Sequence, residues 1–217
     1  MFTRGGEGLG TAYLDDQQLR ASYLTYYVPV NLGKVQLLLE ELRPVLPILP
    51  DEEFRVLDLG GGPGTGALAL LDWCCSESLP PATSIRMTIV DRSAEVLRLC
   101  AELWQAYAGQ AGIQSIRPVQ TVVCNLERSL PSVFQMKAHD NGYHLIIVQN
   151  LLSELFTKSS DPSGQRTAFV SHLLERLAPD GSLMLIEPAL KSTSRGLHEV
   201  RNNLLAESRC SVYSPCL

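Results

Sequence analysis

The chain has 217 residues, a formal net charge of −5 at pH 7 and 45% hydrophobic residues, which suits one domain with a sizeable core rather than two. The acidic balance argues against a protein that holds nucleic acid by electrostatics alone, because neutralising phosphates requires clustered Lys and Arg. No apolar run reaches the roughly 20 residues that a membrane-spanning helix needs, so no membrane partner is expected.

The start of the chain carries no targeting signal that the sequence reveals. Met1 to Gly10 contains no apolar signal core, and Asp15 and Asp16 follow soon after, unlike an Arg-rich, acid-poor transit peptide. A cytoplasmic protein is the default expectation. The six cysteines include no Cys-x-x-Cys pair, so we interpret most of them as small buried hydrophobic residues rather than as an oxidised framework.

Three units follow one another: a mobile tail over residues 1–16, a helical segment over residues 17–50 and a larger domain over residues 51–217. The tail is Gly-rich and polar without periodicity. The helical segment places apolar residues at helical spacing from Val35 to Leu46, and a run of prolines ends it. The segment carries Tyr23, Tyr26 and Tyr27. These tyrosines either cover a cofactor or line an acceptor pocket, or they pack the segment on the sheet, and packing is favoured.

The stretch from Val56 to Gly66, with the sequence Val-Leu-Asp-Leu-Gly-Gly-Gly-Pro-Gly-Thr-Gly, predicts a strand, a glycine turn and a helix. The apolar run from Phe54 to Leu59 suits a buried parallel strand, and a second apolar run opens the helix at Ala67. Glycines in such a turn let the backbone approach a ligand closely. The candidate cofactor-binding residues of the turn are Gly60, Gly61, Gly62 and Gly64.

Glycine spacing alone fits two cofactors, because Gly62-x-Gly64-x-x-Ala67 also satisfies the dinucleotide pattern. Asp58, at the end of the strand, discriminates between them. A carboxylate would repel the pyrophosphate of NAD, whereas S-adenosylmethionine (SAM) brings an ammonium and a sulfonium group. Asp58 is therefore a candidate cofactor-binding residue, and SAM is favoured. The alternative is a tight structural turn that binds nothing.

A second strand, Ile85 to Val90, ends in Asp91 and Arg92. In nucleoside-binding α/β folds, an acid at this position accepts hydrogen bonds from the ribose hydroxyls. Asp91 and Arg92 are therefore candidate cofactor-binding residues. The alternative is that Asp91 or Ser93 caps the following helix, and we favour ribose binding.

Polar residues also follow the third predicted strand, Val119 to Cys124. Asn125 and the backbone amide of Leu126 would contact the adenine ring of the cofactor there. The equal alternative for Asn125 is an ordinary loop turn.

The fourth predicted strand, Tyr143 to Val148, is nearly continuously apolar, as a central parallel strand requires, and Gln149 and Asn150 follow it. Ligands of doubly wound sheets lie beyond the carboxyl ends of the strands. The polar residues that end the four strands are therefore predicted to converge at one edge of the sheet.

Glu154 lies one turn into the segment after the fourth strand, on the same face as Asn150. It would orient or deprotonate a methyl acceptor, and an exposed surface acid is the equal alternative. Asn150 and Glu154 are the catalytic candidates. No Asn-Pro-Pro-Tyr clamp follows the strand and no cysteine stands there for covalent attack, so the sequence identifies neither an amine clamp nor a nucleophile.

Alternating strands and helices predict a doubly wound, mostly parallel α/β sheet with right-handed crossovers. A helix with apolar residues from Phe169 to Leu177 is expected to stop at the turn Pro179-Asp180-Gly181, before a fifth strand over Ser182 to Ile186. Such a sheet ordinarily ends in an antiparallel hairpin, but only Cys210 to Leu217 remain. We expect a domain truncated at its C-terminus, with an exposed sheet edge.

Four segments are distinctive in combination: Val90 to Ala94, Leu152 to Leu155, Glu187 to Leu205 and Ser214 to Cys216. Together they resemble the methyltransferase-like proteins that assemble the mitochondrial small ribosomal subunit, and their bacterial relatives. The resemblance covers roughly Leu19 to Leu217. It implies a Rossmann-like class I SAM-dependent methyltransferase, with the small ribosomal subunit or its rRNA as partner. For a eukaryotic protein with a missing transit peptide it implies the mitochondrial matrix.

That family also carries a Pro-Cys-Pro-His stretch that leads into further cysteines holding a metal or iron–sulfur centre. Cys216 matches the first cysteine, but Leu217 stands where the second proline would be, and the sequence ends there. Zinc or a cluster normally takes four protein ligands. Cys216 therefore predicts part of a site at most, and zinc or an iron–sulfur cluster only with a longer C-terminus.

Methyl transfer from SAM needs mainly an aligned acceptor and the exclusion of water, because the sulfonium activates its own methyl group. We expect a SAM-dependent methyltransferase that acts on rRNA or a related acceptor of the small ribosomal subunit. The alternatives are a catalytically silent assembly factor with the same fold and a small-molecule methyltransferase. NAD binding is the least favoured hypothesis.

Overall fold

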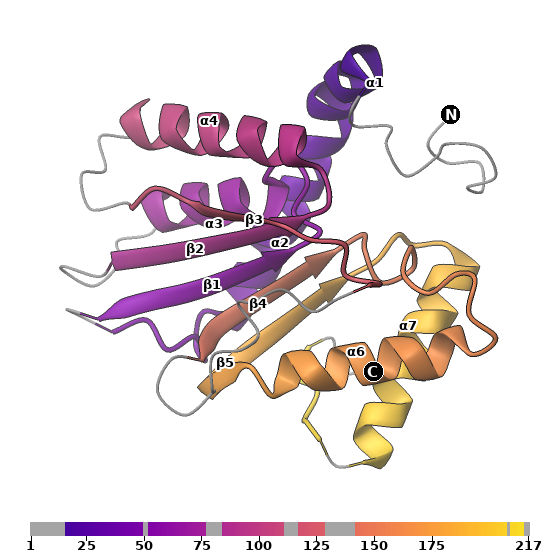
Figure 1. Cartoon of the computed structure of the whole chain (residues 1–217). Coiled ribbons are helices and arrows are strands. Elements are labelled where there is room, and N and C mark those ends of the chain that lie inside the picture. The colour runs from indigo at the N-terminus through magenta and orange to yellow at the C-terminus, as the bar shows by residue number, and fades with distance from the viewer. Residues whose placement is uncertain are drawn as a thin grey trace.

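A computed structural model of the chain describes residues 16–49, 52–76, 84–110, 117–128, 142–207 and 209–214 (Figure 1). In chain order the elements are α1 (Gln17–Ser22), the π-helix η1 (Tyr23–Tyr27), α2 (Val28–Leu42), β1 (Glu53–Leu59), α3 (Thr65–Ser76), β2 (Ser84–Asp91), α4 (Ala94–Gln110), β3 (Gln120–Val123), β4 (Tyr143–Gln149), α6 (Pro162–Leu174), β5 (Leu177–Ile186) and α7 (Lys191–Ala206).

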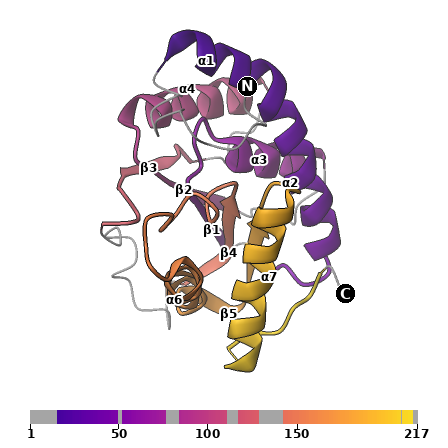
Figure 2. The same cartoon turned by 90° about the vertical axis from the view of Figure 1, so that its right-hand side faces the viewer.

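The five strands form one sheet in the order β3-β2-β1-β4-β5, and all four pairings are parallel. The strand order reverses between β1 and β4, so the topological switch point of this doubly wound sheet lies between these two strands. The predicted doubly wound parallel sheet is confirmed. Its strands run toward the right-hand side of Figure 1, which is the side that faces the viewer in Figure 2.

Two hydrophobic cores lie on opposite faces of the sheet, because successive side chains of a strand point to opposite sides. In β1, Val56 packs into the core formed with α2, α3 and α4, and Leu57 packs into the core formed with α6 and α7. Ile147 and Val148 of β4 divide in the same way. Figure 1 shows α3 and α4 on one face and α6 and α7 on the other.

The N-terminal helical segment runs without interruption from Gln17 to Leu42. Asp16 caps it, and Oδ1 of Asp16 accepts hydrogen bonds from the N–H groups of Gln18 and Leu19, both 2.9 Å long. The wider π turn of η1 ends two residues before Pro29, which has no N–H to continue the regular ladder. The helix ends at Leu42, so Val45, predicted on its apolar face, lies beyond it and is exposed.

The boundary between α6 and β5 differs from the prediction. Leu177, predicted in the helix, is the first residue of β5 and pairs with Tyr143. The predicted turn at Pro179-Asp180-Gly181 lies inside β5, where the register with β4 shifts and Asp180 has a φ of 61°. The helix pattern extended too far because apolar spacing alone does not separate the last turn of a helix from the start of a buried strand.

Among the described helices, none is long and apolar enough to cross a membrane. Residues 1–15 of the predicted tail, and residues 215–217 with Cys216, lie outside the described residues. β3 and β5 are the outer strands of the described sheet.

Candidate functional site

The glycine turn after β1 uses three left-handed residues. Gly60, Gly62 and Gly64 have φ values of 65°, 53° and 90°, which side-chain-bearing residues adopt only at a cost. Backbone hydrogen bonds hold the turn in place. The N–H groups of Gly60 and Gly61 donate to the carbonyl of Val90 over 2.8 and 3.3 Å, and the N–H of Gly64 donates to the carbonyl of Gly61 over 2.8 Å.

The other glycines of the turn are required by contact rather than by φ. A Cβ on Gly61 would lie 2.5 Å from Cγ2 of Ile89 and 2.9 Å from Oδ2 of Asp58. A Cβ on Gly66 would lie 2.7 Å from the same Asp58 oxygen. The motif therefore wraps the Asp58 carboxylate closely, which explains why positions 61 and 66 are glycines.

Asp58 is buried, with 1% of its surface exposed, and its Oδ2 has no hydrogen-bond partner. Burial raises the pKa of its carboxyl to about 8, and the negative charge of Asp91 adds to this, while a hydrogen bond from the Ala67 backbone opposes it. An orphaned buried oxygen of this kind is costly to maintain. It marks Asp58 as a group prepared for a ligand.

Asp91 connects two loops at the carboxyl edge. Its Oδ2 accepts a 3.0 Å hydrogen bond from the N–H of Gly62, and its Oδ1 accepts a 2.9 Å hydrogen bond from the N–H of Ser93. Ser93 caps α4, with its hydroxyl oxygen accepting from the N–H of Val96 over 3.3 Å. Asp91 therefore fixes the position of the glycine turn, and each of its oxygens keeps a second lone pair for a ligand hydroxyl.

The predicted residues after β3 occupy a tight turn. Oδ1 of Asn125 accepts a 3.0 Å hydrogen bond from the N–H of Glu127, and the Asn125 side chain is exposed. Leu126 is buried in the core beneath α6 and α7. The carbonyl oxygen of the Asn125 side chain is thus engaged locally, and its amino group remains as the polar group for a base.

Gln149 and Asn150 extend β4 at the centre of the edge. The side-chain amide of Gln149 donates a 3.1 Å hydrogen bond to the carbonyl of Asn31 in α2, across 118 residues of sequence. Asn150 has a φ of 54°, and its N–H donates to the carbonyl of Ile186 in β5 over 2.8 Å. Asn150 is held in a left-handed conformation at the end of its strand, a position where strained residues accompany functional sites.

Glu154 lies in a turn that three contacts hold in place. The Arg166 guanidinium in α6 donates to the carbonyls of Ser153 and Leu155 over 2.9 and 3.0 Å. Oε1 of Glu187, directly after β5, accepts a 2.7 Å hydrogen bond from the N–H of Leu152. The backbone around Glu154 is therefore fixed by side chains of two neighbouring elements.

The Glu154 carboxylate reaches the same edge as the other acids. Its side chain is solvent-accessible, yet loss of water on one side raises its pKa, and Arg92 lowers it while Glu187 and Asp91 raise it further. These electrostatic influences place Arg92, Asp91 and Glu187 around Glu154. Two predicted groups, the cofactor candidate Arg92 and the catalytic candidate Glu154, are thus brought together.

Sequence reasoning missed two further residues at this edge. Glu187 directly follows β5, much as Asp91 ends β2, and its Oε2 is buried without a partner. The rule of polar residues at strand ends would have found it. Asn31 is a buried polar residue, 5% exposed, inside the apolar face of α2. Asn31 lies one helical turn before Val35, where the apolar spacing begins, and that spacing was the only signal for it.

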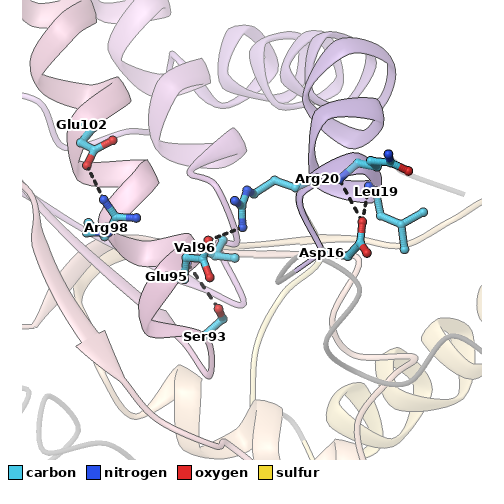
Figure 3. A network of polar contacts seen from close by, with 9 residues as sticks. Asp16, Leu19, Arg20, Ser93, Glu95, Val96, Arg98 and Glu102 are labelled. Atoms are coloured by element: carbon cyan, nitrogen blue, oxygen red, sulfur yellow. Dashed lines mark hydrogen bonds and ion pairs between the residues drawn. The ribbon is translucent and has the colours of Figure 1, made fainter.

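The N-terminal segment also forms an ion pair with the start of α4. Figure 3 shows the guanidinium of Arg20 in α1 pointing at the carboxylate of Glu95 in the first turn of α4. The nitrogen and oxygen are 2.6 Å apart. Figure 2 shows α1 beside α4 and α2 passing along the edge of the sheet.

The charges at this edge suit a cationic ligand. Four acids gather at the carboxyl edge of the sheet, and Arg92 is a cation that acts on one of them, Glu154. The acids are Asp58, Asp91, Glu154 and Glu187. A pyrophosphate would meet repulsion from these acids, whereas a nearby ammonium or sulfonium would lower the raised pKa of Asp58 and favour its ionised form. The residues therefore fit SAM better than NAD. Among the described residues, no group of three or more His, Cys, Asp or Glu side chains is placed to hold a metal ion.

Comparison with known proteins agrees with the predicted resemblance. Residues 18–217 match the family described as "Mitochondrial small ribosomal subunit Rsm22". Over 188 residues the chain is 27% identical to a Dictyostelium discoideum protein described as "Probable polyketide synthase 29", a match that covers 84% of this chain and 5% of that protein. The chain thus spans a small part of the curated relatives that it matches.

Solved structures establish the fold. The CurJ carbon methyltransferase superposes with a TM-score of 0.51 and 21% identity, covering 87% of this chain and 43% of that chain. The plantazolicin methyltransferase BpumL, solved with SAH, superposes with a TM-score of 0.52 and 13% identity, covering 87% of this chain and 60% of that chain. The chain therefore has the class I SAM-dependent methyltransferase fold that the sequence predicted.

Proposed function

The chain belongs to the mitochondrial small ribosomal subunit Rsm22 family, and on that premise we propose that it binds SAM and methylates rRNA of the small ribosomal subunit or a related acceptor. The observation that carries the proposal is the buried, unpartnered oxygen of Asp58 under the glycine turn. An acid held in this way at the carboxyl edge of the sheet suits the positively charged amino-acid end of the cofactor.

The remaining candidate residues take roles that follow from their positions. Asp91 would accept hydrogen bonds from the ribose hydroxyls, while the glycines from Gly60 to Gly64 would let the amino-acid end approach the backbone. The Asn125 amino group and the backbone amide of Leu126 would contact the adenine. Arg92, Gln149 and Asn150 would border the same pocket.

When bound, SAM would supply a methyl group that its sulfonium already activates. The chain would then need to orient the acceptor and exclude water. Asn150 would orient the acceptor from the end of β4. Glu154, whose pKa partial burial raises toward neutrality, would accept a proton from the attacking group.

The family name supports the small ribosomal subunit as partner and, for a eukaryotic protein, the mitochondrial matrix as location. With a net charge of −5, RNA contact would be local or shared with ribosomal proteins rather than driven by the whole surface. A metal or cluster through Cys216 forms no part of the proposal.

A second candidate is methylation of a small molecule. It is favoured by the 27% identity to a probable polyketide synthase, although that match covers 5% of the relative. A third candidate, a catalytically silent assembly factor, is favoured by the sequence Asn150-Leu151-Leu152-Ser153, which lacks the amine clamp of nucleic-acid methyltransferases. The three candidates share the cofactor site. The first two differ in the methyl acceptor, and the third transfers no methyl group.

The decisive experiment has two stages. Isothermal titration with SAM and with NAD compares the unchanged protein with Asp58→Asn, and with Glu102→Gln as a control for an exposed acid on α4. We expect SAM binding that Asp58→Asn weakens and Glu102→Gln preserves. Absence of SAM binding would overturn the proposal.

Labelled-methyl transfer is then measured with small-subunit rRNA, with assembled subunits and with small thiol, amine and β-keto acceptors. Transfer to RNA supports the first candidate, and transfer only to small acceptors supports the second. Binding of SAM and of the subunit without transfer would establish the silent assembly factor.

A further inference from the structure

The glycine turn has no backbone donor left for a negatively charged ligand group. From Gly60 to Gly64, every residue with an N–H donates it to an acceptor within the site. The acceptors are the carbonyls of Val90 and Gly61 and the Asp91 carboxylate. Pro63 has none. The amino-acid end of SAM carries a carboxylate as well as an ammonium, and that carboxylate requires hydrogen-bond donors when it is removed from water.

Side chains next to the turn can provide those donors. Tyr23 lies in η1, in the part of the N-terminal segment that passes beside the turn, and the side chains that act on its hydroxyl are those of Asn31 and Thr65, with the carboxylates of Glu154 and Asp58 further away. Thr65 is 4% exposed, and its buried hydroxyl oxygen has no partner with hydrogen-bonding geometry. Two unpartnered buried oxygens, on Thr65 and Asp58, therefore flank the turn beneath Tyr23.

Asn31 holds Tyr23 in this position. Its side chain hydrogen-bonds to the Tyr23 hydroxyl, and its backbone carbonyl accepts from the Gln149 amide at the end of β4. Tyr23 also stacks on Tyr27, with ring centroids 5.6 Å apart. Asn31 therefore connects the Tyr23 side chain to the end of β4, where the cofactor would bind.

The Tyr23 hydroxyl keeps its proton under ordinary conditions. Burial raises its pKa above the usual value, and the nearby carboxylates of Glu154 and Asp58 add to this, although the neighbouring side chains of Asn31 and Thr65 act in the opposite direction. A neutral hydroxyl can donate to a carboxylate without repelling the neighbouring ammonium. The π turn that carries Tyr23 is a rare feature that is frequent at functional sites.

We propose that the Tyr23 hydroxyl, positioned by Asn31, donates a hydrogen bond to the carboxylate of the cofactor's amino-acid end, so that the N-terminal helical segment forms one wall of the cofactor site. This inference rests on the proposed binding of SAM. It assigns the segment over residues 17–42 to the site itself rather than to packing alone.

The test compares two thioether ligands that differ only at the end in question. S-adenosylhomocysteine carries the amino-acid end, and 5′-methylthioadenosine lacks it. Isothermal titration measures both ligands with the unchanged protein, with Tyr23→Phe and with Tyr26→Phe. Tyr26 lies in the same π-helix, but 67% of its surface is exposed, so it is a matched control. Thermal unfolding of each variant verifies that the fold is retained.

We expect Tyr23→Phe to weaken S-adenosylhomocysteine about tenfold or more, the effect of one hydrogen bond to a charged group, and to leave 5′-methylthioadenosine unchanged. Tyr26→Phe should change neither. The inference is overturned if Tyr23→Phe binds both ligands like the unchanged protein, or weakens both equally. Failure of the unchanged protein to bind either ligand would instead overturn the proposed function, and the inference with it.

Discussion

The N–H of Gly62 donates a 3.0 Å hydrogen bond to Oδ2 of Asp91, joining the loops that follow β1 and β2. The acid that was predicted to hold a ribose therefore also shapes the turn on which the amino-acid end of the cofactor would rest. The two candidate subsites share one carboxylate, and a change at Asp91 should affect both.

Asp91→Asn should weaken SAM binding about tenfold or more and lower the free energy of unfolding by about 1–3 kcal/mol. Both carboxylate oxygens accept from backbone N–H groups, so the amide NH2 of Asn must face one of those donors. Titration with SAM and urea unfolding measure the two effects.

Ser93→Ala is the matched control for that variant. It removes the cap on Val96 and should cost about 1 kcal/mol of stability while SAM affinity stays the same. If Asp91→Asn lost stability but kept its affinity, Asp91 would be a purely structural residue.

Asp58→Asn should become more stable relative to the unchanged protein as pH rises. Asp58 has a pKa of about 8 in the folded protein and an ordinary value near 3.8 when unfolded. Between these values the folded state holds a proton that the unfolded chain has released, so stability falls with rising pH by up to about 1.4 kcal/mol per pH unit. The Asn variant lacks this slope.

Urea unfolding across this range, from about pH 4 to above about pH 8, gives the difference between the two proteins. It should grow with pH and become constant once Asp58 is ionised in the folded state. A difference that does not change with pH would show that Asp58 is ionised throughout.

Gly64→Ala should destabilise the protein through two separate effects. The residue has a φ of 90°, which costs a side-chain-bearing residue about 1–3 kcal/mol, and a Cβ there would overlap Sγ of the buried Cys100. Adding Cys100→Ala should relieve the overlap but not the backbone strain. A double-mutant cycle by urea unfolding separates the terms, and strict additivity would exclude the contact with Cys100.

The Arg20–Glu95 ion pair should contribute less than about 1 kcal/mol and weaken in salt, because Glu95 is 44% exposed. Its measurable effect should be local. Replacing Arg20 by Ala should speed hydrogen exchange in α1 without changing exchange in the sheet. Arg98→Ala is the matched control, since its 3.1 Å pair with Glu102 lies within α4 and does not touch α1. Equal exchange in α1 for both variants would contradict this role.

The glycine turn, the strands and their polar ends were predictable because they are written in short local patterns. Asp58 and Asp91 each follow an apolar run directly, and parallel strands bring such ends together without further information. The position of Leu177 was not predictable, because its assignment depends on pairing with Tyr143 rather than on its neighbours in the chain.

The roles of Asn31 and Gln149 lie beyond any local pattern. Gln149 was predicted to border the cofactor from its place after the fourth predicted strand. The hydrogen bond from its side-chain amide to the Asn31 carbonyl, however, joins residues that are 118 positions apart in the sequence. The place of Tyr23 depends on a single extra residue in a helical turn, which no periodicity of the sequence announces.

The hydrogen bonds that fix the turn from Gly60 to Gly64 also have a kinetic consequence. A loop that is bonded to Val90, Asp91 and its own Gly61 is already ordered before a ligand arrives, so binding would cost little conformational entropy there. Any slow step in association would instead come from rearrangement of the helix over residues 17–42. The site thus combines a preformed glycine turn with an N-terminal helical segment from a distant part of the sequence. The association rate constant of the cofactor would therefore report on movement of that segment alone.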